Sequence, residues 1–309
     1  METKTQTTAQ VKQYEIRDRI VIHKLPVISP TFLNFWCPII PDLPYQRVTD
    51  LQVDLYHSYN LVHEKEHGNL MLYSHVEGPL PREIHLELRY HVERLPLLYS
   101  LESERVGDIR SRLLFSRHLS FERYVDESPR VKELAELVVG DRANILEKAR
   151  RLYDYVLENG TCLLAGRDRQ AQSSEDVHAL FVSLCRSLNI PARFVVGEEL
   201  DTFSEEESDS ISSGYHAWAE FFAPGIGWLP VDASFSCKYK KSYLFGNLPS
   251  NHIAWSVGRD ILLQPPQTGG RLLFFMAPYA EVAGKIHLHV FRKITSRELS
   301  FSQSFSNAL

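Results

Sequence analysis

Three side chains in the second half of the chain have the chemical types that nucleophilic acyl chemistry needs. Ser174 precedes a long amphipathic run, His216 opens a strand-like run, and Asp232 ends the next one. A serine attacks a carbonyl only when a base takes its proton, and that base needs a third group to orient it. The three residues could therefore act as nucleophile, base and orienting carboxylate.

The position of Ser174 allows two interpretations. The apolar residues that follow it recur with the period of a helix buried along one side: Val177, Leu180, Phe181, Leu184, Cys185 and Leu188. Ser173 or Ser174 could cap this helix, because a serine oxygen accepts hydrogen bonds from the unpaired N–H groups of the first turn. The same N–H groups stabilise an anion, so a nucleophile or an oxyanion is also favoured there. Cys185 lies on the buried side and is predicted to be a packed thiol.

The segment 215–232 predicts a hairpin that brings base and orienting group together. Two β-rich runs flank a turn at Pro224-Gly225, and His216 and Asp232 lie at the open end of the pair. Asp232 could accept a hydrogen bond from one imidazole nitrogen and leave the other facing the start of the helix.

Several neighbouring residues are expected to support these three. Trp218 and Trp228 are expected to pack the hairpin, and Trp218 is also the candidate substrate-binding residue, as a wall of an acyl channel. Arg186 and Arg193 are expected to anchor the helix and the following strand. Strand alternation is expected to turn Glu220 away from the site.

The elements that must position these residues follow one another as strands, helices and strands again. Residues 14–98 alternate in polarity as half-buried strands do, helical periodicity dominates the middle, and strand-like runs return near the C-terminus. This order indicates an α+β fold and not a parallel βαβ alternation. We predict a β-rich N-terminal domain over residues 1–110 and a catalytic domain over residues 111–309.

Two helices are predicted ahead of the amphipathic run. The first opens with Ser128 as a candidate cap and Pro129 at the first helical position. The second is expected to stop at Asn159-Gly160, because glycine commonly ends a helix. Cys162 then falls in a strand-like segment.

Composition excludes several classes of protein. The chain has 309 residues, of which 44% are hydrophobic and 24% charged, so it can bury a substantial core. Its 34 basic and 39 acidic residues give a net charge of -5 without a basic run, so nucleic acid is not an expected partner. The polar N-terminus and the lack of a long apolar segment predict a cytoplasmic protein with no membrane partner. The four cysteines show no C-x-x-C and are expected to be reduced thiols. The oligomeric state is left open.

Two patterns that could bind metal are set aside. The H-E-x-x-H motif at residues 63–67 lies between strand-like runs, and histidines four residues apart in a hairpin turn do not share a face as they do on a helix. The acidic residues of 199–210 lack the spacing of calcium ligands, and this segment is expected to be a solvated loop that could gate the cleft. Neither a metal nor another cofactor is expected.

The blocks around the three residues resemble the transglutaminase-like superfamily, the papain-like cysteine acyl-transfer fold. The matching blocks are R-x-x-x-I-P-A-R at 186–193, V-x-G at 195–197, H-A-W-x-E at 216–220 and G-W-x-P-V-D at 227–232. The resemblance covers about residues 128–260 and implies a central helix packed on an antiparallel β-sheet. It also implies acyl transfer or hydrolysis at an amide, ester or thioester through a covalent acyl-enzyme, with Ser174, His216 and Asp232 as the catalytic residues.

Ser174 departs from the family, which has cysteine at this position. The helix dipole and an imidazolium can convert a thiol to thiolate, whereas a hydroxyl must lose its proton during attack. Three interpretations remain: a natural serine enzyme, a cysteine enzyme with an engineered Cys-to-Ser change that would act on carrier-bound thioesters in biosynthesis, or a catalytically silent member that binds peptides or proteins. Retention of His216 and Asp232 favours the first two. The expected partner is an acyl substrate: a peptide, a protein or a carrier-bound thioester.

Overall fold

The computed structural model describes most of the chain. The described residues are 11–24, 32–95, 109, 111–120, 122–142, 144–164, 174–200, 210–211, 215–239, 244–282 and 288–299. For some residues within these ranges only the backbone is described: 24, 160–164, 174–176, 210–211, 237–239 and 288–289.

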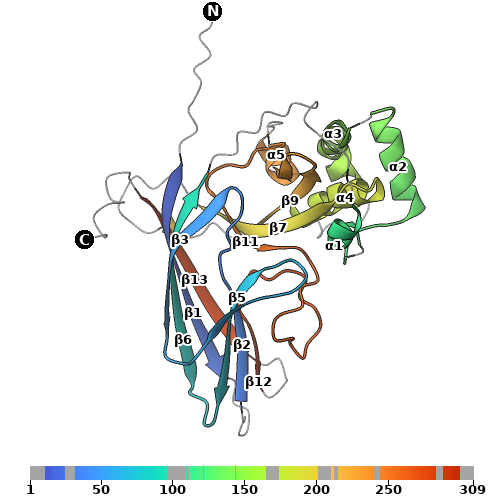
Figure 1. The fold of residues 1–309 in the computed structure, drawn as a ribbon. Helices are drawn as coiled ribbons and strands as arrows, with labels where there is room; N and C mark the ends of the chain where they lie inside the picture. Colours follow the sequence, from blue (N-terminus) through green and yellow to red (C-terminus); the bar gives the residue numbers. More distant parts are fainter. Residues whose placement is uncertain are drawn as a thin grey trace, which may run out of the picture.

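Two antiparallel sheets form the β-rich part of the molecule, in the lower half of Figure 1. The first has the order β3-β6-β1-β13-β8 and comprises β1 (Lys12–Lys24), β3 (Gln46–Leu55), β6 (Glu83–Arg94), β8 (Ser210–Ile211) and β13 (Leu288–Leu299). The second has the order β12-β2-β5-β4 and comprises β2 (Phe32–Pro38), β4 (Asn60–His63), β5 (Leu70–Glu77) and β12 (Tyr279–Val282). The predicted strands of residues 14–98 are therefore present.

The C-terminal strands return to the sheets that the N-terminal strands begin. β13 pairs with β1 from Leu288 to Leu299, and β12 pairs with β2. This pairing crosses the expected division at residue 110, and the two predicted domain ranges stay a prediction. The inward residues of both sheets share one apolar core, for example Ile84, Leu86 and Leu88 of β6, as period-two alternation requires.

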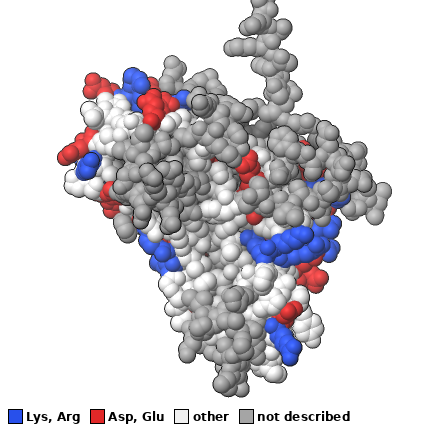
Figure 2. Space-filling model, turned by 180° about the vertical axis from the view of Figure 1, so that it is seen from behind, with Lys and Arg blue, Asp and Glu red and all other residues white. Residues whose placement is uncertain are grey.

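Ion pairs occupy the polar side of the first sheet. Lys12 pairs with Glu298 and Arg19 with Glu87 across neighbouring strands. On the face drawn in Figure 2, Lys and Arg side chains likewise lie near Asp and Glu side chains. Among the described residues of that face, positive charge therefore lies near negative charge.

The third sheet carries the helices. It has the order β10-β9-β7-β11, with β7 (Ala192–Glu199), β9 (Tyr215–Ala223), β10 (Gly227–Val231) and β11 (His252–Val257), and every pair is antiparallel. The helical elements are η2 (Leu113–Phe115), α1 (Ser116–Leu119), α2 (Pro129–Val139), α3 (Ile145–Leu164), α4 (Ser174–Ser187) and α5 (Ala233–Tyr239). They lie beside β7 and β9 at the upper right of Figure 1.

Helix α4 is the centre of this helical layer. It contacts β7 and β9 on one side and α2, α3 and α5 on the others. Most of its predicted stripe is buried, with Phe181, Leu184 and Cys185 fully enclosed, whereas Leu180 and Leu188 are partly exposed. Each large apolar side chain buried in this way stabilises the fold by about 1.5–3 kcal/mol. The predicted architecture, a central helix on an antiparallel sheet in an α+β fold, is confirmed.

The ends of the two preceding helices differ in part from the prediction. Pro129 is the first residue of α2 as expected, but the Ser128 hydroxyl makes no capping hydrogen bond. The predicted stop at Asn159-Gly160 is wrong, because α3 continues to Leu164 and includes the backbone of Cys162. Glycine inside a helix costs only about 1 kcal/mol relative to alanine, less than the buried face of α3 contributes.

The H-E-x-x-H segment forms a hairpin turn, as predicted. His63 ends β4, and the Glu64 carboxylate accepts the backbone N–H groups of Glu66, His67 and Asn69 at 2.6, 2.9 and 2.9 Å. Glu64 therefore organises the turn between β4 and β5.

Two of the cysteines, Cys37 and Cys185, are free and buried. Burial raises the pKa of both thiols, so they are unreactive packing groups. The side chains of Cys162 and Cys237 lie outside the described part. No helix among the described residues is long and apolar enough to span a bilayer.

Candidate active site

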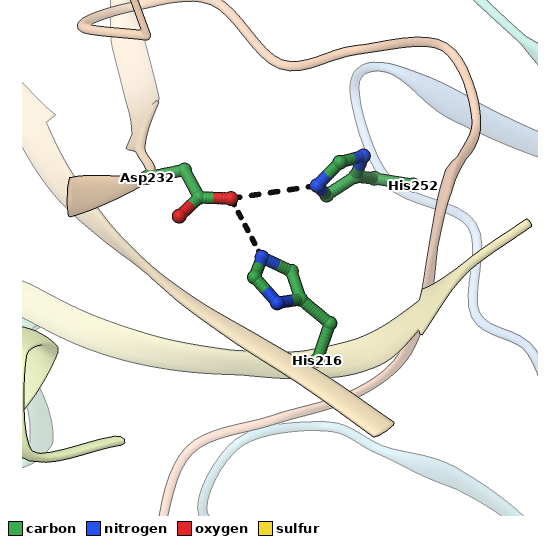
Figure 3. A group of neighbouring side chains, drawn as sticks. All are labelled: His216, Asp232 and His252. Atoms are coloured by element: carbon green, nitrogen blue, oxygen red, sulfur yellow. Dashed lines mark hydrogen bonds and ion pairs between the residues drawn. The ribbon is translucent and has the colours of Figure 1, made fainter. Parts of the chain in front are cut away.

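The His216 imidazole and the Asp232 carboxylate are in direct contact. His216 is the second residue of β9, and Asp232 follows β10 immediately. Their Nε2 and Oδ2 atoms are 2.6 Å apart (Figure 3). Asp232 is fully buried, while the His216 side chain is 14% exposed. The hairpin therefore brings the predicted base and orienting group together, with one edge of the base reachable from outside.

Asp232 is fixed by the helix that it precedes. Its Oδ1 accepts the backbone N–H of Phe235 at 2.9 Å and the hydroxyl of Ser234 at 3.0 Å, so that Asp232 caps α5. Oδ2 is thereby turned toward the imidazoles. A carboxylate held at one oxygen by backbone is a rigid partner for His216 at the other.

Two further histidines approach the same carboxylate, and neither was expected from the sequence. His252 begins β11, and its Nε2 lies 3.4 Å from Oδ2, within ion-pair distance but without hydrogen-bond alignment. His178, one turn into α4, places Nε2 3.6 Å from Oδ1 and accepts the Ala233 N–H at 3.0 Å. The spacing of four residues from Ser174 could have indicated His178, whereas no local signal indicates His252.

Gly197 lets β11 carry His252 to this position. β7 pairs with β9 on one side, with Gly197 opposite His216, and with β11 on the other, with Gly197 opposite Ala254. A Cβ at residue 197 would overlap the Ile253 carbonyl oxygen. The glycine of the V-x-G block therefore permits the close approach of the two strands.

The surrounding imidazoles keep Asp232 ionised. Burial on its own would raise the pKa of Asp232, but its interactions with the neighbouring histidines, first of all the hydrogen bond from His216, outweigh burial and hold that pKa well below its usual range. Burial lowers the pKa of His252 in turn, although Asp232 partly opposes this effect. Asp232 is thus suited to orient an imidazole and to stabilise its cation rather than to exchange a proton.

Trp218 lies beneath the two imidazoles. Its ring stacks on His216 with centroids 6.1 Å apart and meets His252 edge-on at 5.8 Å. Trp228 packs against Phe222 of the neighbouring strand and lies 4.0 Å from the guanidinium of Arg193. The expected packing roles of both tryptophans are confirmed. Trp218 is fully buried, and its role toward a substrate stays a prediction.

Helix α4 begins at Ser174, but the side chain of Ser174 lies outside the described part, as does all of Ser173. The second turn of α4 nevertheless lies beside the His–Asp pair, because His178 contacts both Asp232 and Ala233. The convergence of Ser174 on His216 stays a prediction that this neighbourhood supports.

A model of the transglutaminase-like superfamily matches residues 132–233, which include Ser174, His216 and Asp232. This part of the chain is therefore similar to the core domain of the transglutaminase-like superfamily. A solved structure from Cytophaga hutchinsonii, named as a candidate cysteine protease, is similar to this chain with a TM-score of 0.58 and 14% identity, over 94% of this chain and 92% of that one. That likeness shows a shared fold.

An uncharacterized protein of Haemophilus influenzae is 27% identical over 219 residues. The match covers 57% of this chain and spans 59% of the relative's length.

Arg186 and Arg193 act as anchors, as predicted. Arg186 donates to Ala192 O from Nε and Nη2, at 3.0 and 2.7 Å, and Nη2 also lies 2.9 Å from Glu122. It therefore ties the end of α4 to the start of β7. Arg193 donates from Nε to Glu220 at 2.7 Å.

The expectation that Glu220 points away from the site face was wrong. Strand residues of equal parity share a face, and the regular pairing of β9 places His216, Trp218 and Glu220 on one side. Glu220 is fully buried and accepts from Tyr45 and Arg193, each at 2.7 Å. It lies four residues from His216, about 13 Å along the strand, and so remains outside the site.

Proposed function

We propose that this transglutaminase-like protein is an enzyme that transfers or hydrolyses an acyl group at an amide, ester or thioester, through a covalent acyl-enzyme on Ser174. The proposal rests on the 2.6 Å contact between His216 Nε2 and Asp232 Oδ2, next to which α4 places His178. With Nε2–H donated to the carboxylate, Nδ1 is the nitrogen that accepts the proton of the nucleophile.

In this reaction Ser174 Oγ bonds to the acyl carbonyl carbon while His216 Nδ1 takes the hydroxyl proton. The carbonyl electron pair moves to oxygen, and the N–H groups of the first turn of α4 stabilise the oxyanion. Asp232 stabilises the imidazolium that forms. When the carbonyl re-forms, the bond to the leaving group breaks and His216 returns the proton to that group. Water or an amine then attacks the acyl-serine and restores the hydroxyl.

The acyl substrate is proposed to be a peptide, a protein or a carrier-bound thioester, acted on in the cytoplasm. The cysteine form of the same site is the second candidate, because the chain keeps the base and the carboxylate that a thiol would use. A silent binding protein is less well supported. A buried carboxylate surrounded by His178, His216 and His252 is costly to maintain without a chemical task.

The test compares the protein that carries Ser174 with the Ser174→Cys and Ser174→Ala variants. Each is incubated with an activated aryl ester, and intact mass reports the covalent acyl group. Ser187→Ala, at the other end of α4, is the matched control and should label as the unmodified protein does. Labelling of the serine protein but not of Ser174→Ala is the expected result. Labelling of Ser174→Cys alone would replace the serine reaction with the cysteine one, and labelling of none would contradict the proposed function.

A further inference from the structure

His252 has an imidazole nitrogen that the proposed reaction does not use. Asn251 Nδ2 donates to Leu200 O at 3.0 Å, so Asn251 Oδ1 is the atom that faces His252 Nδ1, at 3.1 Å. Nδ1 must then carry the proton of this contact, and in the neutral ring Nε2 carries a lone pair. Nε2 is buried without a hydrogen-bond partner among the described residues.

That lone pair is directed at a carboxylate. His252 Nε2 lies 3.4 Å from Asp232 Oδ2, and two electron-rich atoms at this separation attract a cation between them. His178 differs, because its Nε2 already accepts the Ala233 N–H at 3.0 Å. The lone pair of His252 Nε2, which has no hydrogen-bond partner among the described residues, therefore lies near the same Asp232 oxygen that His216 contacts (Figure 3).

We propose that His216, Asp232 and His252 form a binding site for one divalent transition-metal ion of the Zn²⁺ type. Their donor atoms, the two Nε2 atoms and Oδ2, all lie within 4.8 Å of one another. Two imidazoles and one carboxylate are a ligand set that zinc and its neighbours accept, with bonds of about 2.0–2.2 Å. Calcium and magnesium prefer sites made of oxygen atoms.

Binding would change the proton position on His216. Nε2 now donates its proton to Asp232 at 2.6 Å, and a metal ion can bind Nε2 only after that proton leaves. The neutral ring keeps one proton, which moves to Nδ1, so the ring charge is unchanged. With a proton on Nδ1, His216 no longer accepts one from Ser174. Metal binding is thus expected to inhibit the enzyme. Only this inhibition depends on the proposed function, whereas the binding itself does not.

The ligands are far apart in the sequence, which is why no metal was expected from it. His216 and His252 lie on different strands and Asp232 lies between them at the start of α5. The His216 side chain, 14% exposed, provides the route for the ion, since the His252 side chain is fully buried.

Calorimetric titration of the chelator-treated full chain with Zn²⁺, and the visible absorption of bound Co²⁺, test the site. One ion per chain is expected, and His252→Gln should weaken binding at least about tenfold. The control variants His85→Gln, on the exposed surface of β6, and His63→Gln, in the H-E-x-x-H turn, should bind as the unmodified chain does. Equal binding by His252→Gln, or loss of binding in His63→Gln alone, would overturn the proposal.

Nitrogen NMR of the unmodified chain covers the case in which His252→Gln does not fold. Zn²⁺ should shift Nε2 of His216 and His252 and leave His178 Nε2 unchanged, and a spectrum without these shifts would reject the site. Acyl labelling with and without Zn²⁺ then separates the two proposals. If the chain binds zinc but is never acylated, the metal site is supported and the proposed reaction is contradicted. If the chain is acylated but binds no zinc, the proposed reaction is supported and the metal site is contradicted.

Discussion

Among the described residues, two buried carboxylates lie within ion-pair distance of a histidine ring, and the groups that neutralise them differ. Asp232 is surrounded by the imidazoles of His178, His216 and His252. Glu122 instead lies 2.9 Å from a guanidinium nitrogen of Arg186 and 3.4 Å from one of Arg117, with His67 farther away at 3.9 Å.

The difference determines which imidazoles can exchange protons. At Glu122 the positive charge belongs to arginines, which do not lose it near neutral pH. Burial, followed by the nearby arginines, lowers the pKa of His67 and of His118 to about 3, so both rings stay neutral. At Asp232 the described side chains within ion-pair distance are imidazoles, and the proposed reaction uses one of them as its base. The first cluster is suited to hold the fold and the second to do chemistry.

Asp232→Asn should have the largest effect. Asparagine keeps an Oδ1 to cap α5 but presents an amide N–H₂ to His216 Nε2, so the imidazole must carry its proton on Nδ1 and cannot accept one from the nucleophile. Acyl labelling of whichever protein reacts, Ser174 or Ser174→Cys, should fall by about 10⁴-fold. The measurement is the rate of mass addition, with urea unfolding to show that the fold persists. An unchanged rate would remove Asp232 from the reaction.

Arg186→Met should produce the largest loss of stability. It leaves the buried Glu122 without its closest cation and Ala192 O without its donor, which costs about 3–5 kcal/mol of unfolding free energy. Urea denaturation measures this loss.

The matched control for Arg186→Met is Arg150→Met, which breaks the half-exposed pair with Asp154 on α3. It should cost at most about 1 kcal/mol. Similar losses in the two variants would refute the structural role of the Glu122 cluster. The double variant Arg186→Met with Glu122→Leu should recover part of the loss, because no buried charge is left unpaired.

Acid should act on the Glu122 cluster through His67, which lies beside Glu122, and through His118, whose ring centroid lies 6.0 Å from that of His67. The unfolded chain binds protons on His67 and His118 near pH 6.5, whereas the folded chain resists them down to about 3. Stability is therefore complete above pH 6.5 and falls as pH decreases, by about 1.4 kcal/mol per pH unit for each histidine. Urea midpoints between about pH 6.5 and 5, above the range in which ordinary carboxylates titrate, measure this slope. His118→Gln should remove about half of it, and the exposed control His85→Gln should leave it unaltered. A slope that His118→Gln does not change would show that His118 is charged in the fold.

Local patterns predicted the elements well, because each pattern is produced by the element itself. The alternation of β6 and the stripe of α4 each reflect burial of one side of a single element. Local patterns do not show which strands pair with one another. The alternation within β13 identifies a strand, but nothing local shows that it pairs with β1 at the other end of the chain. The predicted end of α3 was wrong because it depended on Gly160, and a glycine disfavours a helix only weakly.

The candidate site also contains residues that local patterns bring together and residues that only the tertiary fold brings together. His216 and Asp232 belong to one hairpin, so the sequence was sufficient to place them together. His252 reaches them through the pairing of β11 with β7, which only the tertiary fold supplies. Glu220 was misjudged although its parity with His216 was readable from the sequence alone.

Tyr45→Phe should have the smallest effect of these variants. It should show whether Glu220 is a structural carboxylate like Glu122 or one that serves the chemistry like Asp232. Glu220 shares a strand face with His216, yet it is held by the guanidinium of Arg193 and by the Tyr45 hydroxyl, as Glu122 is held by guanidiniums. Burial and the neighbouring Glu220 raise the pKa of Tyr45 well above its usual value, so the hydroxyl remains a donor. Its removal should cost about 1.5 kcal/mol of unfolding free energy, the lower end for a bond to a charged group.

The acyl-labelling rate of Tyr45→Phe should stay unchanged, because Glu220 lies about 13 Å along the strand from His216. Tyr73→Phe, which removes a half-buried neutral bond to Asn34, is the matched control and should cost about 1 kcal/mol or less. If the labelling rate falls in Tyr45→Phe while its urea midpoint matches that of Tyr73→Phe, Glu220 contributes to the reaction as Asp232 does. In that case the shared strand face, and not the kind of cation beside a carboxylate, would determine which buried acids serve the chemistry.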